Sequence, residues 1–182
     1  MIFTPTRLAG AYCIDLDARQ DERGHFARVW CAREMAEHGL ETRIAQASMS
    51  FNARRGTLRG MHYQVAPHQE VKIVRCTRGS IWDVIVDVRP GSPTYLQHLC
   101  VELTAASHRQ LYIPQGFAHG FQTLEDECEV GYQMSEFYAP DAQRGFRWND
   151  PAVGIIWPLP NPILNDRDRG YPDLVPAPQP AP

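Results

Sequence analysis

The stretch Arg59-Gly60-Met61-His62-Tyr63-Gln64 is followed, eight residues after its histidine, by Glu70-Val71-Lys72. Side chains in a β-strand alternate between its two faces, so residues two positions apart share a face. Apolar residues follow Lys72, and residues 81–88 read Ile-Trp-Asp-Val-Ile-Val-Asp-Val. We therefore predict that one histidine and one lysine lie on neighbouring strands of an apolar sheet. Burying an ionisable group is costly unless it is paired or used, so these strands are a candidate functional site.

Short strand-like segments recur along most of the chain, separated by turn signals such as Asp21-Glu22-Arg23-Gly24 and Arg89-Pro90-Gly91-Ser92-Pro93. Many short strands with Gly/Pro turns predict an all-β antiparallel sandwich or barrel. Helix-forming residues favour one short helix at 32–38, and a second is expected near 104–107. The predicted strands are residues 11–15, 26–30, 46–52, 57–64, 70–78, 80–88, 96–103, 110–113, 120–124 and 127–135.

The bulk composition is typical of a soluble globular protein, with 182 residues, 21% charged and 43% hydrophobic. The net charge of −3 indicates no nucleic-acid partner, and no apolar run is long enough to span a membrane. The N-terminus does not read as a signal peptide. We expect a single domain over residues 1–175 and a Pro-rich, disordered tail over residues 176–182.

The five cysteines, Cys13, Cys31, Cys76, Cys100 and Cys128, are widely spaced and form no Cys-x-x-Cys. This spacing argues against a disulfide framework or a thiolate zinc site. Buried, reduced cysteines are typical of a cytoplasmic protein, which is the location we expect.

The segment Pro114-Gln115-Gly116-Phe117-Ala118-His119 resembles the second motif of the cupin superfamily, whose members are small antiparallel jelly rolls with a site in the barrel. In metal-binding cupins the first motif supplies a His-x-His pair and a glutamate. Here that motif would be His62-Tyr63-Gln64, where a glutamine replaces the second histidine. The resemblance therefore implies a cupin-type jelly-roll barrel that uses no metal and no cofactor and performs acid–base chemistry instead.

A closer resemblance runs in order along most of the chain, from about Ile14 to Asp168. It is to the dTDP-4-dehydrorhamnose 3,5-epimerase family. The motifs that carry it are Asp21-Glu22-Arg23-Gly24-His25-Phe26, Arg59-Gly60-Met61-His62-Tyr63-Gln64, Lys72-Ile73-Val74, Ile81-Trp82-Asp83-Val84, Pro114-Gln115-Gly116-Phe117-Ala118-His119-Gly120-Phe121, Tyr138-Ala139-Pro140 and Trp148-Asn149-Asp150-Pro151.

This resemblance implies that the substrate is a nucleotide-linked 4-keto-6-deoxyhexose, whose C3 and C5 protons are acidic because they lie next to the C4 ketone. Inversion needs a base, an acid opposite it, and a group that stabilises the enolate. By resemblance, His62 is the base, oriented by Asp168, and a histidine side chain titrates near neutral pH. Lys72 is the charge beside the enolate, and Tyr132 is the acid.

The resemblance also implies a set of substrate-binding residues. Arg23 and Arg59 are expected to grip the diphosphate, which suits a planar guanidinium, and Phe26 is expected to stack on the nucleobase. His119 could equally be a structural partner of Asp83. The remaining expected contacts with the substrate are Gln46, Ser48 and Tyr138. The family also implies a homodimer in which N-terminal strands are exchanged and Phe26 serves the neighbouring site.

Two positions depart from the residues common in family members that make rhamnose: Ser48 stands where asparagine is usual, and Arg28 stands where glutamate is usual. Both lie near the expected nucleotide and sugar contacts, so the sugar and the base stay open. Inversion at C3 alone or at both C3 and C5 also stays open.

Two other kinds of function remain as alternatives. One is a metal-dependent cupin dioxygenase or isomerase that uses His62, Glu70 and His119 as ligands. The other is a sugar-binding cupin without catalysis, although binding alone does not require an acid and a base together.

Overall fold

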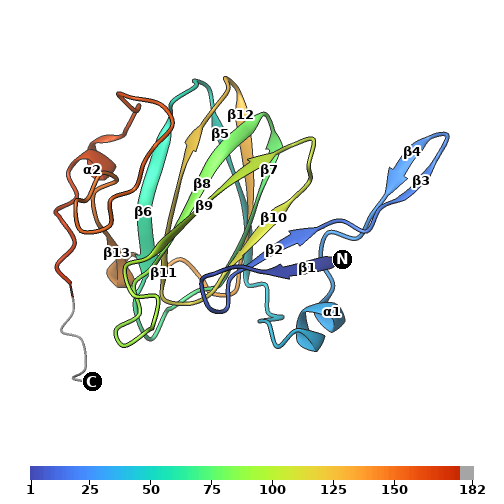
Figure 1. The fold of residues 1–182 in the computed structure, drawn as a ribbon, viewed down its shortest axis with the longest axis horizontal. Coiled ribbons are helices and arrows are strands. Elements are labelled where there is room, and N and C mark those ends of the chain that lie inside the picture. The colour runs from blue at the N-terminus through green and yellow to red at the C-terminus, as the bar shows by residue number, and fades with distance from the viewer. Residues whose placement is uncertain (177–182) are drawn as a thin grey trace.

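The computed structural model describes residues 1–176, whose strands form two facing antiparallel sheets and a separate hairpin (Figure 1). The larger sheet has six strands, in the order β1 (Ile2–Pro5), β2 (Tyr12–Asp15), β10 (Gln110–Ile113), β7 (Lys72–Arg78), β12 (Cys128–Met134) and β5 (Gln46–Asn52). The smaller sheet has five, in the order β13 (Gln143–Gly145), β6 (Leu58–Gln64), β11 (Phe117–Thr123), β8 (Ser80–Asp87) and β9 (His98–Thr104). The predicted all-β jelly-roll architecture is confirmed.

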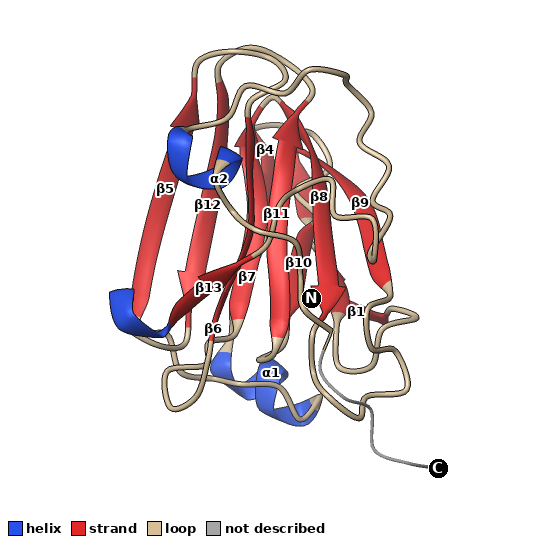
Figure 2. Cartoon of the chain, turned by 90° about the vertical axis from the view of Figure 1, so that its left-hand side faces the viewer, coloured by secondary structure: helices blue, strands red, loops and turns tan. Residues whose placement is uncertain are grey.

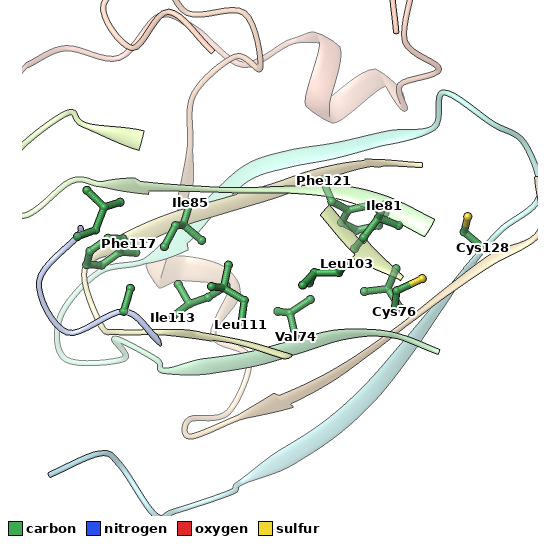
Figure 3. Packing of buried hydrophobic residues seen from close by; sticks show 13 residues of the cluster. Val74, Cys76, Ile81, Ile85, Leu103, Leu111, Ile113, Phe117, Phe121 and Cys128 are labelled. Carbon is green, nitrogen blue, oxygen red and sulfur yellow. The ribbon is translucent and has the colours of Figure 1, made fainter. Parts of the chain in front are cut away.

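The main core fills the space between the two sheets (Figure 3). Val74 and Leu111 come from the six-stranded sheet, while Ile85, Leu103 and Phe121 come from the five-stranded sheet. Each of these side chains is almost fully buried. Removal of this apolar surface from water holds the two sheets together.

Further apolar clusters lie on the outer face of each sheet. Val84, Val86 and Ala118 of the smaller sheet pack against Phe146 and Val153 of the C-terminal segment. Strands β8 and β11 are therefore covered on both faces, which explains their nearly continuous burial.

Helix α1 (Ala32–Glu37) packs on part of the outer face of the larger sheet, where its buried residue Met35 meets Ile73 and Tyr112. Helix α1 lies below the strands in Figure 2.

A β-bulge in β6 determines which of its side chains face inward. His119 of β11 pairs with His62, but Phe121 pairs with Arg59, so β6 contains one extra residue over this interval. Simple alternation would place Arg59 and His62 on opposite faces, whereas both line the same cavity. A Cβ on Gly60 would lie 2.6 Å from the Cα of Gly120, so only glycine allows this close approach of β6 and β11.

Several predicted elements differ from the structure. Residues 27–30 form no strand, because β4 (Gly24–Phe26) ends earlier and pairs with β3 (Arg19–Asp21) in the separate hairpin. Residues 105–107 form a turn, so the predicted second helix at 104–107 is wrong. The sequence prediction also missed five elements of the described chain, which are β1, β3, β13, the 3-10 helix η1 (Pro140–Ala142) and helix α2 (Asp166–Arg169).

The prediction that His62 and Lys72 lie on neighbouring strands is wrong. β6 belongs to the five-stranded sheet, and β7 belongs to the six-stranded sheet that faces it. The two side chains therefore approach the interior from opposite walls.

All five cysteines are free thiols, as predicted. Within residues 1–176, no helix has the length and apolar character needed to cross a membrane. Apart from Pro176, the predicted tail lies outside the described residues.

Candidate active site

A cavity of about 450 Å³ lies between the two sheets, a size typical of small-molecule sites. It brings together every predicted site residue except Arg23 and Phe26. The predicted residues that line it are Gln46, Ser48, Arg59, His62, Lys72, His119, Tyr132, Tyr138 and Asp168.

His62 and Asp168 form a hydrogen-bonded dyad, with 2.7 Å between His62 Nε2 and Asp168 Oδ1. Asp168 is almost fully buried, while the His62 side chain is 29% exposed to the cavity. A carboxylate accepts hydrogen bonds, so Nε2 carries a proton, and in the neutral imidazole the lone pair is on Nδ1. The second oxygen, Asp168 Oδ2, accepts from the backbone N–H of Gly60 at 3.3 Å.

Asp168 is held in place by the first turn of α2. The Asn165 side chain is the N-cap of this helix, and its Oδ1 accepts from the backbone N–H of Asp168 at 2.7 Å. Helix α2 lies beside β6 (Figure 1), which brings two residues 106 positions apart into contact.

Tyr132 and Lys72 approach the cavity from the six-stranded sheet. Tyr132 on β12 pairs with Val74 on β7, and Met134 pairs with Lys72, so the two side chains lie one row apart on the inner face. Burial raises the pKa of the Tyr132 phenol, and a hydrogen bond with Ser50 lowers it by less. The phenol therefore stays protonated at neutral pH, as a proton donor requires.

The Lys72 ammonium is not free in the cavity. Its Nζ donates to Glu70 Oε1 at 2.5 Å, and the two side chains are only 13% and 12% exposed.

His119 forms a second, fully buried dyad, with its Nε2 2.8 Å from Asp83 Oδ2. The His119 ring meets the Tyr132 ring edge-on, with centroids 6.1 Å apart. The structural partnership with Asp83 that the sequence suggested is thus present, and His119 lines the cavity as well.

Two guanidinium groups line the cavity without a carboxylate partner among residues 1–176. Arg59 donates from Nε to Asn52 Oδ1 at 2.8 Å, and Arg167 donates from Nε to the Tyr171 hydroxyl at 2.9 Å. Lys72 pairs with Glu70, and the one remaining lining carboxylate of the described chain, Asp168, leaves these two guanidiniums in excess. The cavity therefore carries uncompensated positive charge for an anionic ligand.

Three glutamines hold Tyr138 at the rim of the cavity. The Gln46 side chain accepts from the backbone N–H of Tyr138 at 2.7 Å, and Gln143 accepts from its hydroxyl at 2.7 Å. Gln64 accepts from the backbone N–H of Ala139 and donates to the carbonyl of Phe137. The residue that replaces the second cupin histidine therefore positions this loop.

Arg23 and Phe26 lie on the β3–β4 hairpin, which extends away from the sheets (Figure 1), and they do not line the cavity of their own chain. Phe26 is 81% exposed. Arg28 also lies outside the cavity, where its guanidinium pairs with Glu34 at 2.5 Å.

Several cavity residues were not predicted from the sequence. Arg167 could have been recognised, because it directly precedes Asp168 in a matched segment. The others carry no signal of their own, since a side chain's approach to the cavity depends on the tertiary fold. The residues that were missed are Tyr63, Gln64, Phe121, Met134, Gln143, Asn165 and Arg167, while Glu70 was named only as a metal ligand of the alternative function.

The three ligands of the metal-cupin alternative are each held by another group: His62 by Asp168, His119 by Asp83, and Glu70 by Lys72. Within residues 1–176, no three His, Cys, Asp or Glu side chains are grouped to hold a metal ion. The donor set is thus organised as ion pairs and dyads and does not fit a metal centre.

The fold and the cavity together define a cupin-type jelly roll whose cavity holds two histidine–carboxylate dyads and a tyrosine. The sequence profile of the dTDP-4-dehydrorhamnose 3,5-epimerase family matches residues 5–175. The chain is 42% identical over 175 residues to an enzyme of that name from Methanothermobacter thermautotrophicus, covering 94% of each chain.

Solved structures agree with this relationship. The dTDP-4-dehydrorhamnose 3,5-epimerase of Bacillus anthracis, with TDP and PPi bound, superimposes with a TM-score of 0.92 at 38% identity, covering 95% of this chain and 99% of that one. A 3'-monoepimerase from Streptomyces bikiniensis, in complex with dTDP-quinovose, has a TM-score of 0.86 at 32% identity, covering 93% and 85%. This chain belongs to the dTDP-4-dehydrorhamnose 3,5-epimerase family, whose members are isomerases.

Proposed function

We propose that this protein inverts the configuration at C3 of a dTDP-linked 4-keto-6-deoxyhexose. C5 of the same sugar is the second candidate position. The observation that carries the proposal is the placement of His62 and Tyr132 on opposite walls of one cavity. Inversion requires a proton to leave one face of the sugar and another to arrive at the other face. Two groups on the same sheet would serve only one face.

In the proposed mechanism, His62 Nδ1 removes the proton from the carbon next to the ketone. The C–H electron pair forms the C=C bond of an enolate, and negative charge moves to the C4 oxygen. Asp168 supports this step because it fixes the ring tautomer and stabilises the protonated imidazole.

The second half of the reaction comes from the opposite wall. The Tyr132 O–H gives its proton to the other face of the same carbon, so a C–H bond forms and the ketone returns. The Lys72 ammonium lies on the same wall and stabilises the enolate oxygen. His62 then loses a proton to solvent and Tyr132 regains one, so the cycle is redox-neutral and needs no cofactor.

Arg59 and Arg167 supply the diphosphate site in this proposal. A nucleoside diphosphate linked to a sugar carries two negative charges, and these guanidiniums are the uncompensated positive groups of the described cavity. Gln46, Ser48 and His119 line the same cavity, and we assign them to the substrate. Tyr138, at 56% exposure on the rim, is assigned to the nucleotide end.

Proton exchange tests this function directly. Purified protein is incubated in D₂O with a panel of nucleotide-linked 4-keto-6-deoxyhexoses, and NMR records deuterium at C3 and C5. We expect exchange at C3 with the dTDP-linked sugar, and exchange at C5 tells double from single inversion. His62→Ala should abolish exchange and keep dTDP affinity within about threefold, since the diphosphate site is separate. Absence of exchange with every sugar would refute the proposal, and tight binding alone would then favour the sugar-binding alternative.

We further propose a homodimer in which the β3–β4 hairpin of each chain completes its neighbour's cavity. The hairpin extends from the sheets with Phe26 exposed, and the edge strand β5 exposes Met49 and Phe51 at 62% and 49%. Such an apolar edge favours pairing with a second chain.

Complementation tests the dimer. Phe26→Ala and His62→Ala chains are unfolded together and refolded as a mixture, so that mixed dimers contain one cavity with both native residues. We expect exchange activity above that of either variant alone, and a mass consistent with two chains by light scattering. A monomeric mass, or a mixture no more active than its parents, would contradict this part of the proposal.

A further inference from the structure

Two carboxylates line the cavity within the described part of the chain, Asp168 and Glu70. Asp168 orients the proposed base. Glu70 has no role in the mechanism above, although its side chain is only 12% exposed. A buried charge of this kind needs a reason to be retained, because its desolvation is costly.

The backbone next to Glu70 is fixed, because both the N–H and the carbonyl of Val71 hydrogen-bond to Ser135. The N–H of Val71 donates to Ser135 Oγ at 2.8 Å, and the N–H of Ser135 donates to the carbonyl of Val71 at 3.0 Å. Strand β7 begins at Lys72, and Glu70 directly precedes the anchored Val71, so Val71 links the two paired residues. Their ion pair is therefore built into the fold.

A lysine side chain is a flexible four-carbon stem with three donor hydrogens on its ammonium. In an open cavity such a side chain samples many positions, and catalysis by a charge requires that it stay where negative charge develops. The 2.5 Å contact with Glu70 Oε1 occupies one donor direction of Lys72 Nζ and leaves the others for the cavity.

We propose that Glu70 is a positioning residue that acts through Lys72. Its carboxylate holds the ammonium at the place where the C4 oxygen of the substrate becomes an enolate. The inference rests on the proposed epimerisation, and it gives a role to a residue that takes no part in the proton transfers.

A double-mutant cycle tests it, with Glu70→Gln, Lys72→Met and the double variant, assayed by C3 proton exchange in D₂O. Glu70→Gln keeps the size of the side chain and removes its charge. We expect kcat to fall about 10- to 150-fold, the range for loss of a charge-assisted hydrogen bond, with KM within about threefold. In the Lys72→Met background the same change should cost no more than about twofold, because Glu70 has nothing left to position.

Glu127→Gln is the matched control, since it removes the carboxylate of the exposed Arg78–Glu127 ion pair outside the cavity and should leave kcat unchanged. Thermal unfolding and dTDP calorimetry of each variant report folding independently of catalysis. An effect of Glu70→Gln that is equally large with and without Lys72 would overturn the inference alone. Failure of the wild-type protein to exchange protons would overturn the proposed function and the inference with it.

Discussion

Replacement of Asp168 by asparagine should disturb the proposed base, because Asp168 accepts two hydrogen bonds and an asparagine side chain has only one oxygen. One carboxylate oxygen accepts from His62 Nε2 and the other accepts from the N–H of Gly60. An asparagine offers one oxygen and one NH₂ group, so it satisfies only one of these donors. If its oxygen accepts from Gly60, the NH₂ group faces His62 and the proton moves to Nδ1, where the base needs a lone pair.

If the asparagine instead turns its oxygen to His62, the buried N–H of Gly60 faces an NH₂ group and loses its partner. Either arrangement also removes the negative charge beside the imidazole. Charge-assisted hydrogen bonds contribute about 1.5–3 kcal/mol, which is about 10- to 150-fold in rate, and the wrong tautomer adds to this. We expect Asp168→Asn to lower kcat for C3 exchange by at least about 100-fold with KM within about threefold.

The assay is NMR-detected deuterium incorporation at C3 under saturating substrate, with dTDP calorimetry to confirm that the cavity is intact. Asp166→Asn is the control, because it makes the same chemical change in the same helix on a fully exposed side chain. Exchange by Asp168→Asn within threefold of the wild type would refute the dyad. So would an equal loss of activity in the Asp166→Asn control.

Three further predictions concern the scaffold around the site. Burial raises the pKa of Asp87, but hydrogen bonds from neighbouring side chains outweigh this and lower it to about 2. The folded state is therefore stabilised above pH 4 by about 2 kcal/mol that is lost as the pH falls toward 2, and urea unfolding of Asp87→Asn should lack this pH dependence. Asn52→Ala removes the acceptor of Arg59 Nε, so dTDP affinity measured by calorimetry should fall about tenfold; unchanged affinity would show that Arg59 needs no such support. Gly60→Ala places a Cβ 2.6 Å from Gly120 Cα, so the free energy of unfolding should fall by about 2 kcal/mol. An unchanged midpoint of urea unfolding would contradict the close approach of the two strands.

Strand positions were predictable from the sequence wherever alternation and turns agree. The predicted bounds of β5 and β10 match the structure, because both are apolar or half-apolar segments between clear breaks. Phe26 misled the prediction, since an aromatic residue followed by Val29 and Trp30 reads as a strand, yet it lies in an exposed hairpin. Strand β13 is polar and depends on pairing with β6, which no local pattern reveals.

The site was predictable as a set of residues but not as an arrangement. Motifs identified His62, Tyr132 and Asp168 individually, and the structure brings all three to one cavity. Proximity along the chain suggested that His62 and Lys72 share a sheet, whereas the turn between them crosses from one sheet to the other. Neither alternation nor spacing could predict the bulge in β6, which turns Arg59 toward the same cavity.

The central claim is that His62 and Tyr132 act on opposite faces of the sugar, and stereochemically resolved exchange in Tyr132→Phe tests it most directly. We expect this variant to incorporate deuterium at C3 with the starting configuration retained, because His62 still removes and returns a proton on its own face. Inverted product should form at least about 100-fold more slowly than in the wild type. Inversion by Tyr132→Phe at the wild-type rate would contradict the claim, because the second proton would then come from elsewhere.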